Sequence, residues 1–202
     1  MSEIFSFGDR VLDLAEIQVM GVLNVTPDSF SDGGQFTTLS SAMMRAEQMI
    51  RQGASIIDVG GESTRPGAAQ VSVQEEMDRV CPVVESLVER FDAVVSVDTS
   101  SPVLMSESIR LGAWLINDVR AFSREGAVEA VKRSSVALCL MHMQGAPVSM
   151  QQAPTYTSVV DEVSDYLQLT VTDLISQGVS SERLLVDPGF GFGKTLQHNM
   201  QI

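Results

Sequence analysis

Polar side chains suited to binding a ligand recur directly after short apolar runs of this sequence. Asn24 follows the run Val19–Leu23, and Asp98, Asn117 and Asp187 each end a similar run. Val, Ile and Leu in runs this short are typical of strands that are buried on both faces, as in parallel sheets. Because α/β folds place their chemistry at the carboxyl ends of such strands, we expect these side chains to meet at one site.

Asp and Asn also favour helix caps and turns, which is the competing interpretation for each of these positions. For Asp58 and Asp118 the two interpretations carry equal weight. For Asp98, Asn117 and Asp187 the sequence favours a functional role, because three acceptor-bearing ends on neighbouring strands exceed what turn chemistry requires.

The elements that must position these side chains repeat along the chain. One unit recurs: a helix ends at a glycine, and a buried strand with a polar residue at its end follows. The glycine, the strand and its polar end are visible in residues 53–58 and again in residues 112–117. Predicted strands cover residues 19–23, 55–59, 94–98, 115–117, 137–141 and 184–187. Predicted helices cover residues 73–90, 125–133 and 158–177, and another is expected to begin with Ser40 as its N-cap and to end at Gly53.

Alternating strands and helices with short connections require parallel strands and right-handed crossovers. The absence of an early GxGxxG segment argues against a dinucleotide-binding sheet. We therefore predict one domain over residues 1–202, an α/β fold of the TIM-type (β/α) barrel, preceded by a hairpin of residues 4–7 and 11–14. Such a barrel has eight strands, so the six predicted here indicate six of eight units, with the barrel incomplete at its C-terminus.

Composition narrows the class of protein. The 202 residues are 44% hydrophobic and carry a net charge of −13, which leaves no electrostatic footprint for nucleic acid or an anionic membrane. Cys81 and Cys139 lack disulfide or metal-site spacing, and His142 and His198 lack metal-ligand spacing, so we expect buried thiols and structural histidines. No apolar run approaches membrane-spanning length, and the expected location is the cytoplasm.

Two long and uncommon segments carry a resemblance to a known family. Residues 24–34, NVTPDSFSDGG, and residues 60–67, GGESTRPG, closely resemble the two signatures of dihydropteroate synthases. The resemblance continues through residues 97–99, 116–118, 141–145 and 187–194. It implies a folate-pathway transferase and sulfonamide target that condenses 6-hydroxymethyl-7,8-dihydropterin pyrophosphate with 4-aminobenzoate.

The resemblance also implies roles for the strand ends. Asp98, Asn117 and Asp187 would hold the pterin ring, and Met141 would pack against its face. A pterin edge offers adjacent N–H donors and a carbonyl acceptor, which suits a carboxylate and an amide. Asn24 would be the one protein ligand of a Mg²⁺ that bridges the substrate's pyrophosphate, as suits an ion that prefers oxygen ligands and retains waters.

The remaining implied roles fall on loops. Thr64 and Arg65 would bind phosphate, and the first two loops would cover the pterin and shape the aminobenzoate pocket through Phe30, Asp32 and Pro66. Asn24, Arg65 and Asp32 are the residues expected to serve catalysis. Walls of the pterin pocket would come from the last glycine-rich loop, through Gly191, Phe192 and Lys194.

Three further expectations concern the molecule as a whole. The family's Ser-Arg-Lys segment and Arg/His pair are not in this sequence, so we expect little synthase activity from this polypeptide alone. Full-length members are expected to be homodimers. The alternatives are a non-catalytic pterin-binding fragment and a pterin-dependent methyltransferase, although the segment TPDSFSDGG favours pyrophosphate chemistry.

Overall fold

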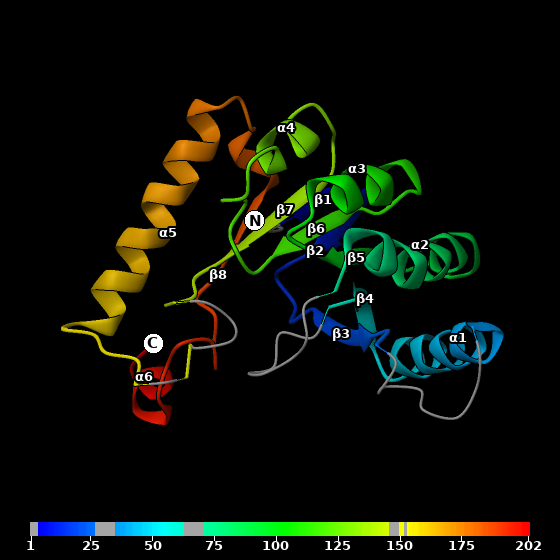
Figure 1. The fold of residues 1–202 in the computed structure, drawn as a ribbon, viewed down its shortest axis with the longest axis horizontal. Coiled ribbons are helices and arrows are strands. Elements are labelled where there is room, and N and C mark those ends of the chain that lie inside the picture. The colour runs from blue at the N-terminus through cyan, green and yellow to red at the C-terminus, as the bar shows by residue number, and fades with distance from the viewer. Residues whose placement is uncertain (1–3, 27–34, 63–70, 146–149, 152) are drawn as a thin grey trace.

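The computed structural model describes residues 4–26, 35–62, 71–145, 150–151 and 153–202. In this part of the chain, six parallel strands form one sheet whose spatial order is the order of the chain (Figure 1). They are β3 (Val19–Asn24), β4 (Ala54–Gly60), β5 (Val94–Asp98), β6 (Leu115–Asp118), β7 (Ala137–Met141) and β8 (Leu184–Asp187). The six predicted strands are thereby confirmed, each to within one residue at either end.

Within the described ranges, six α-helices alternate with these strands. They are α1 (Gln35–Arg51), α2 (Val73–Arg90), α3 (Pro102–Arg110), α4 (Ala127–Val131), α5 (Val159–Ser176) and α6 (Leu196–Gln201), and a short 3-10 turn spans Ser181–Arg183. Serine N-caps begin three of them: Ser72, Ser101 and Ser158 each accept a hydrogen bond from a backbone N–H in the first turn of the helix. None of the helices in the described ranges combines the length and the apolar character that crossing a bilayer requires.

The prediction that α1 starts at Ser40 was wrong. The helix begins at Gln35, and Ser40 lies inside it. Leu39 already packs against the core one residue before the expected cap, because apolar burial outweighs the weak helix preference of serine and threonine. The end of this helix is as expected, since Gly53 adopts a φ of 104° and its N–H donates to the Ile50 carbonyl.

The two faces of the sheet have different roles because side chains alternate along each strand. Ile57, Val59 and their counterparts on neighbouring strands pack against the helices in the larger core. The opposite, concave face carries Ile56 and Asp58, and its lower part is a second apolar cluster. On this face, the polar ends of the strands therefore lie next to an apolar cluster that includes Ile56, Val94 and Leu115.

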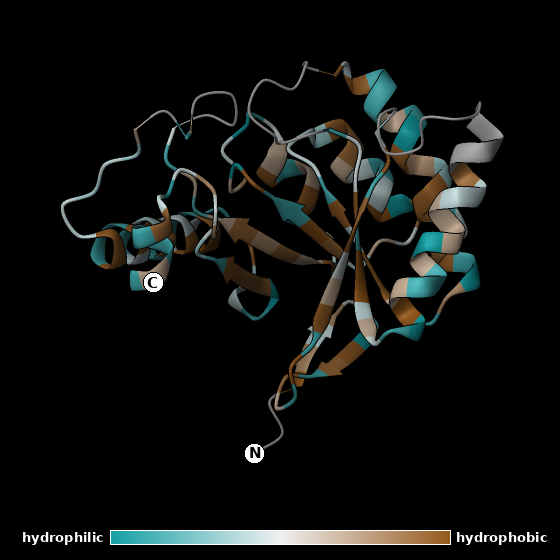
Figure 2. Cartoon of the chain, turned by 90° about the horizontal axis from the view of Figure 1, so that it is seen from below, coloured by the Kyte–Doolittle hydropathy of each residue, from teal (hydrophilic) through white to brown (hydrophobic). Residues whose placement is uncertain are grey.

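The hairpin of β1 (Ile4–Phe7) and β2 (Arg10–Asp13) closes the bottom of the concave face (Figure 2). Phe7 is 1% exposed and packs with Ile56, Val94 and Leu115. The predicted hairpin is confirmed, although its second strand begins and ends one residue earlier than expected. At the two ends of the sheet, no strand of the described ranges pairs with the outer edge of β3 or of β8.

Candidate active site

Three of the predicted strand ends lie in one row across the sheet. Backbone pairing places Asn24 of β3 beside Gly60 of β4, Gly60 beside Asp98 of β5, and Asp98 beside Asn117 of β6. A Cβ built on Gly60 would lie 3.3 Å from Asn24 Oδ1 and 3.7 Å from Asp98 Oδ2. The glycine therefore leaves a space that the oxygens of two neighbouring strands border.

Met141 and Asp187 form a second pair on the same edge. They face each other across β7 and β8. Asn117 pairs with Cys139 of β7, and Cys139 pairs with Leu185 of β8. Met141 lies two residues after Cys139, and Asp187 lies two residues after Leu185. Because side chains alternate along a strand, Met141 and Asp187 lie on the same, concave face as Asn117. Asp187 Oδ1 accepts a hydrogen bond of 2.7 Å from the N–H of Gly189, which fixes its carboxylate at the start of the following loop.

Asp98 ends β5 with its carboxylate on the face shared with Asn24 and Asn117. Within the ranges that the structure describes, no hydrogen-bond donor meets either of its oxygens, whereas the neighbouring Asp58, Asp118 and Asp187 all accept hydrogen bonds. Burial, and then the negative charges of Asp58 and Asp118, raise the pKa of Asp98 well above its usual value. A ligand that brings two N–H donors would relieve this cost.

Asp58 was predicted at a strand end, and this placement was wrong. Gly60 occupies the end of β4, and Asp58 lies one row deeper, 4% exposed. Its Oδ1 accepts from Ser96 Oγ at 2.6 Å, and its Oδ2 accepts from Asn117 Nδ2 at 3.1 Å. Burial raises the pKa of Asp58, and these two hydrogen bonds partly oppose the shift.

Asp118 has the role of a turn residue rather than of a ligand-binding group. It is fully buried, and its oxygens accept from the backbone N–H groups of Arg120 and Phe122 and from the Ser100 hydroxyl. Ala121 and Phe122 have φ values of 50° and 60°. This carboxylate stabilises the strained backbone of the loop after β6.

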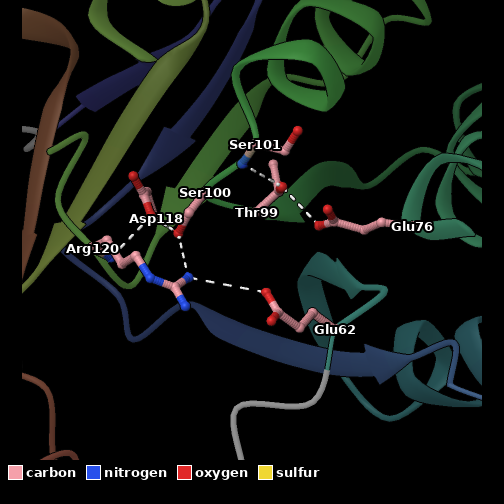
Figure 3. Close-up of polar contacts among 7 residues, drawn as sticks. All are labelled: Glu62, Glu76, Thr99, Ser100, Ser101, Asp118 and Arg120. Atoms are coloured by element: carbon pink, nitrogen blue, oxygen red, sulfur yellow. Dashed lines mark hydrogen bonds and ion pairs between the residues drawn. The ribbon is translucent and has the colours of Figure 1, made fainter. Parts of the chain in front are cut away.

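A polar network joins the loops that follow β4, β5 and β6 (Figure 3). Arg120 Nη1 donates to Ser100 Oγ at 3.0 Å and lies 4.0 Å from Glu62 Oε2. Beside it, Thr99 Oγ1 donates to the buried Glu76 of α2 at 2.8 Å and accepts from the Ser101 N–H. The sequence reasoning missed these contacts, since they join residues that are distant along the chain.

Gly61 marks where the chain leaves β4 for the segment that carries Thr64 and Arg65. A Cβ at this position would lie 2.7 Å from Val80 Cγ2 and 3.1 Å from Glu76 Cγ. Arg79 Nη1 donates to the Gly61 carbonyl at 3.0 Å. Close approach to α2 therefore requires glycine at this position.

The loop after β8 is organised around the buried ammonium of Lys194. Its Nζ lies 2.9 Å from His142 Nδ1, and it donates to the carbonyls of Gly189 and Phe192 at 3.0 and 3.1 Å. Burial lowers the pKa of Lys194 to about 8. The ammonium therefore links the loop after β8 to His142, which directly follows β7.

His142 is buried against Lys194 and Tyr166. Burial, and then the charge of Lys194, lower its pKa to about 4. Its ring packs edge-on against Tyr166, with 5.0 Å between the ring centroids.

The other two predicted residues of the loop after β8 are Gly191 and Phe192. Phe192 is half-buried. Gly191 adopts a φ of 81°, and its N–H donates to Asn199 Oδ1 at 2.9 Å.

Five of the predicted site residues lie outside the described residues. They are Phe30 and Asp32 on the first loop and Thr64, Arg65 and Pro66 on the second. In the described ranges no three His, Cys, Asp or Glu side chains converge where they could hold a metal ion.

The two cysteines are partly buried free thiols. Cys139 belongs to the concave face beside Asn117, and burial together with the charges of Asp187 and Asp58 raises its pKa to about 12.

The sequence reasoning missed the hydrogen bond between Ser96 and Asp58, although one feature of the sequence could have predicted that the two residues are neighbours. Each is a polar residue two positions before the end of its strand, and therefore on the same face as that end.

Known proteins match the chain over nearly its whole length. The family described as pterin binding enzyme matches residues 20–202. The dihydropteroate synthase of Escherichia coli strain K12 is 54% identical over 191 residues, which cover 95% of this chain and 68% of that protein.

Solved structures agree with the sequence comparison. The dihydropteroate synthase of Yersinia pestis, solved as a sulfonamide drug complex, has 50% identity and a TM-score of 0.92, with 98% of this chain and 72% of that chain covered. The Xanthomonas albilineans enzyme, solved with 4-aminobenzoic acid, has 44% identity and a TM-score of 0.91, with 100% of this chain and 71% of that chain covered. The chain therefore belongs to the pterin-binding enzymes and, among them, to the dihydropteroate synthase family.

Proposed function

We propose that this chain binds the pterin substrate of the dihydropteroate synthase reaction along the row from Asn24 to Asn117. In that reaction, the amine of 4-aminobenzoate displaces pyrophosphate from the methylene carbon of 6-hydroxymethyl-7,8-dihydropterin pyrophosphate. The C–N bond forms as the C–O bond to pyrophosphate breaks, so no protein nucleophile is needed. The residues of this chain bind and orient the pterin.

The observation that carries the proposal is the Asp98 carboxylate. It stands on the concave face with its oxygens unmatched by a described donor, and its pKa is raised by burial. The edge of a pterin supplies two adjacent N–H donors, and paired charge-assisted hydrogen bonds would satisfy both oxygens. Asn117 and Asp187, on the same edge, provide the further polar contacts, and Met141 provides an apolar one.

The residues present fit a Mg²⁺ that the substrate helps to hold. Asn24 is exposed at the end of β3, and its Oδ1 borders the space above Gly60, which has no side chain to fill it. One amide oxygen suits an ion that keeps several waters and takes its other ligands from phosphate groups. When bound, Mg²⁺ supplies positive charge that stabilises the departing pyrophosphate.

Roles for the loop residues form part of the same proposal. Thr64 and Arg65 would contact the pyrophosphate, because a cation near the leaving group stabilises the charge that develops there. Phe30, Asp32 and Pro66 would enclose the pterin and the aminobenzoate, and Gly191 and Phe192 would line the pterin pocket. A cytoplasmic location, which the two free thiols favour, and a homodimer of full-length members complete the proposal.

The test is a calorimetric titration of the chain with the pterin pyrophosphate, with and without Mg²⁺. We expect binding that strengthens with Mg²⁺. Asp98→Asn should weaken it by about 10- to 100-fold, since an amide turns one acceptor into a donor that opposes the ligand's own donors. Undiminished affinity of Asp98→Asn would contradict the proposed contact.

Two other results would assign the chain differently. Equal affinity for the pterin with and without its pyrophosphate, unaffected by Mg²⁺, would favour the non-catalytic pterin-binding alternative. Methyltetrahydrofolate bound more tightly than the pyrophosphate substrate would favour the methyltransferase alternative.

A further inference from the structure

A buried carboxylate, Asp58, lies between the apolar cluster of Phe7 and Ile56 and the polar strand ends. Asp58 is 4% exposed, and it sits one row below the edge that Asp98 and Asn117 share. It lies close enough to contribute to the raised pKa of Asp98. Burying a charge beside another acidic group is unfavourable unless the geometry compensates for it.

The contacts of Asp58 determine how the neighbouring amide is turned. An ionised carboxylate only accepts hydrogen bonds, so the Asn117 group 3.1 Å from Asp58 Oδ2 is the Nδ2 donor. The other Asp58 oxygen accepts a separate hydrogen bond of 2.6 Å from Ser96 Oγ. Asn117 Oδ1 therefore points away from Asp58, and no described donor occupies it.

We propose that Asp58 is a positioning residue that turns Asn117 so that its carbonyl oxygen, rather than its NH₂ group, faces the ligand. The inference rests on the proposed function, because it deepens the role of the same pterin site. Asp98 and Asn117 then offer acceptors side by side, which selects a ring edge rich in N–H donors. Without Asp58, the amide could present either end, and this selectivity would be lost.

The first experiment compares a variant that replaces one Asp58 oxygen with an NH₂ donor and a variant that removes the Ser96 donor. Asp58→Asn keeps the volume of the side chain but allows the Asn117 amide to turn over. Ser96→Ala removes the other hydrogen bond and leaves the Asp58–Asn117 contact in place. We expect the Kd of the pterin pyrophosphate to rise about tenfold in Asp58→Asn, the equivalent of one net hydrogen bond, and to change by less than about twofold in Ser96→Ala. Similar Kd values for the two variants would overturn the proposal.

A second experiment exchanges the two groups. In the double variant Asp58→Asn with Asn117→Asp, the amide at position 58 donates and the carboxylate at position 117 again presents an oxygen to the ligand. We expect this exchange to recover affinity relative to either single variant. A purely structural role would predict additive losses instead, and additivity would refute the orienting role.

A third measurement needs no substitution that could impair folding. In the unliganded wild-type chain, NMR should show one Asn117 Nδ2 proton protected from solvent exchange by its hydrogen bond to Asp58. Rapid exchange of both protons would contradict the inference. If wild type itself fails to bind the pterin, the proposed function fails; if wild type binds and Asp58→Asn binds equally well, only the role of Asp58 fails.

Discussion

At the scale of a residue, Gly60 and Gly61 at the end of β4 differ in what an added methyl group would contact. A Cβ at Gly60 would enter the space bordered by Asn24 Oδ1 and Asp98 Oδ2, whereas a Cβ at Gly61 would collide with Val80 of α2. The first position faces the site and the second faces the core. The same substitution should therefore have different effects at the two positions.

We expect Gly60→Ala to weaken binding of the pterin pyrophosphate in the presence of Mg²⁺ while leaving the melting temperature nearly unchanged. Gly61→Ala should lower the free energy of unfolding by about 1–3 kcal/mol, the usual cost of overpacking. Denaturant unfolding and calorimetric titration of both variants provide the check, with each variant serving as the control of the other. A large stability loss in Gly60→Ala would contradict this division.

Single residues also limit what the sequence can predict. Asp98, Asn117 and Asp187 were identified because each ends an apolar run. Asp58 was misplaced by one row, because the run that contains it continues for two more residues to Gly60. Alternation along a strand gives the face on which a side chain lies, but the row depends on pairing with neighbouring strands, which is a long-range property.

At the scale of elements, Lys194 connects the loop after β8 with the end of β7. Its ammonium contacts His142 and two loop carbonyls, and the same loop supplies the N–H that holds Asp187. The order of this loop and the position of Asp187 are therefore coupled.

We expect Lys194→Met to lower the free energy of unfolding by about 1–3 kcal/mol, because carbonyl groups that the ammonium satisfied are left without a donor. Affinity for the pterin should fall in parallel through Asp187. Lys132→Met, which removes a surface ion pair with Glu129, is a matched control with an expected effect below about 1 kcal/mol. Equal losses in the two variants would show that Lys194 does not organise the loop.

The His142 ring predicts a pH dependence of stability. Its pKa is about 4 in the folded protein and 6.5 in its usual state, so between these values the unfolded chain binds more protons. The stability contributed by this group is present above pH 6.5 and is lost as the pH falls towards 4. Asp58 and Asp98 act in the opposite sense in this range, because burial raises their pKa values.

The check is a comparison of variants rather than a single profile. His142→Asn keeps an acceptor for Lys194 but does not titrate, so its melting temperature should fall less than that of wild type from pH 6.5 to 4. Identical slopes would mean that His142 does not titrate as its surroundings indicate.

The elements themselves were largely predictable from the sequence. Apolar runs and glycine terminators place every strand to within one residue at either end, since buried parallel strands have a strong pattern. The start of α1 was not predictable from Ser40, because a polar residue inside a helix looks like a cap when only the sequence is known. The network of Glu62, Arg120 and Ser100 depends on loops meeting in space, which no local pattern encodes.

At the scale of the whole molecule, the net charge of −13 opposes an anionic substrate. We expect the association rate of the pterin pyrophosphate to rise when ionic strength increases from about 10 mM to about 150 mM, because salt screens this repulsion. The uncharged 6-hydroxymethyl-7,8-dihydropterin is the matched control and should show little change. Stopped-flow fluorescence measures both rates, and a fall in the rate for the pyrophosphate would indicate a local positive field strong enough to reverse the global one.

The order of the strands has a consequence for how the protein is made. Each strand pairs with the strand that precedes it in the chain, so a nascent polypeptide can add strands one at a time as it leaves the ribosome. The row from Asn24 to Asn117 is complete once β6 (Leu115–Asp118) has emerged, before β7 and β8 have left the ribosome. The edge from Asn24 to Asn117 can thus form first during translation, and Met141 and Asp187 then join strands that are already paired.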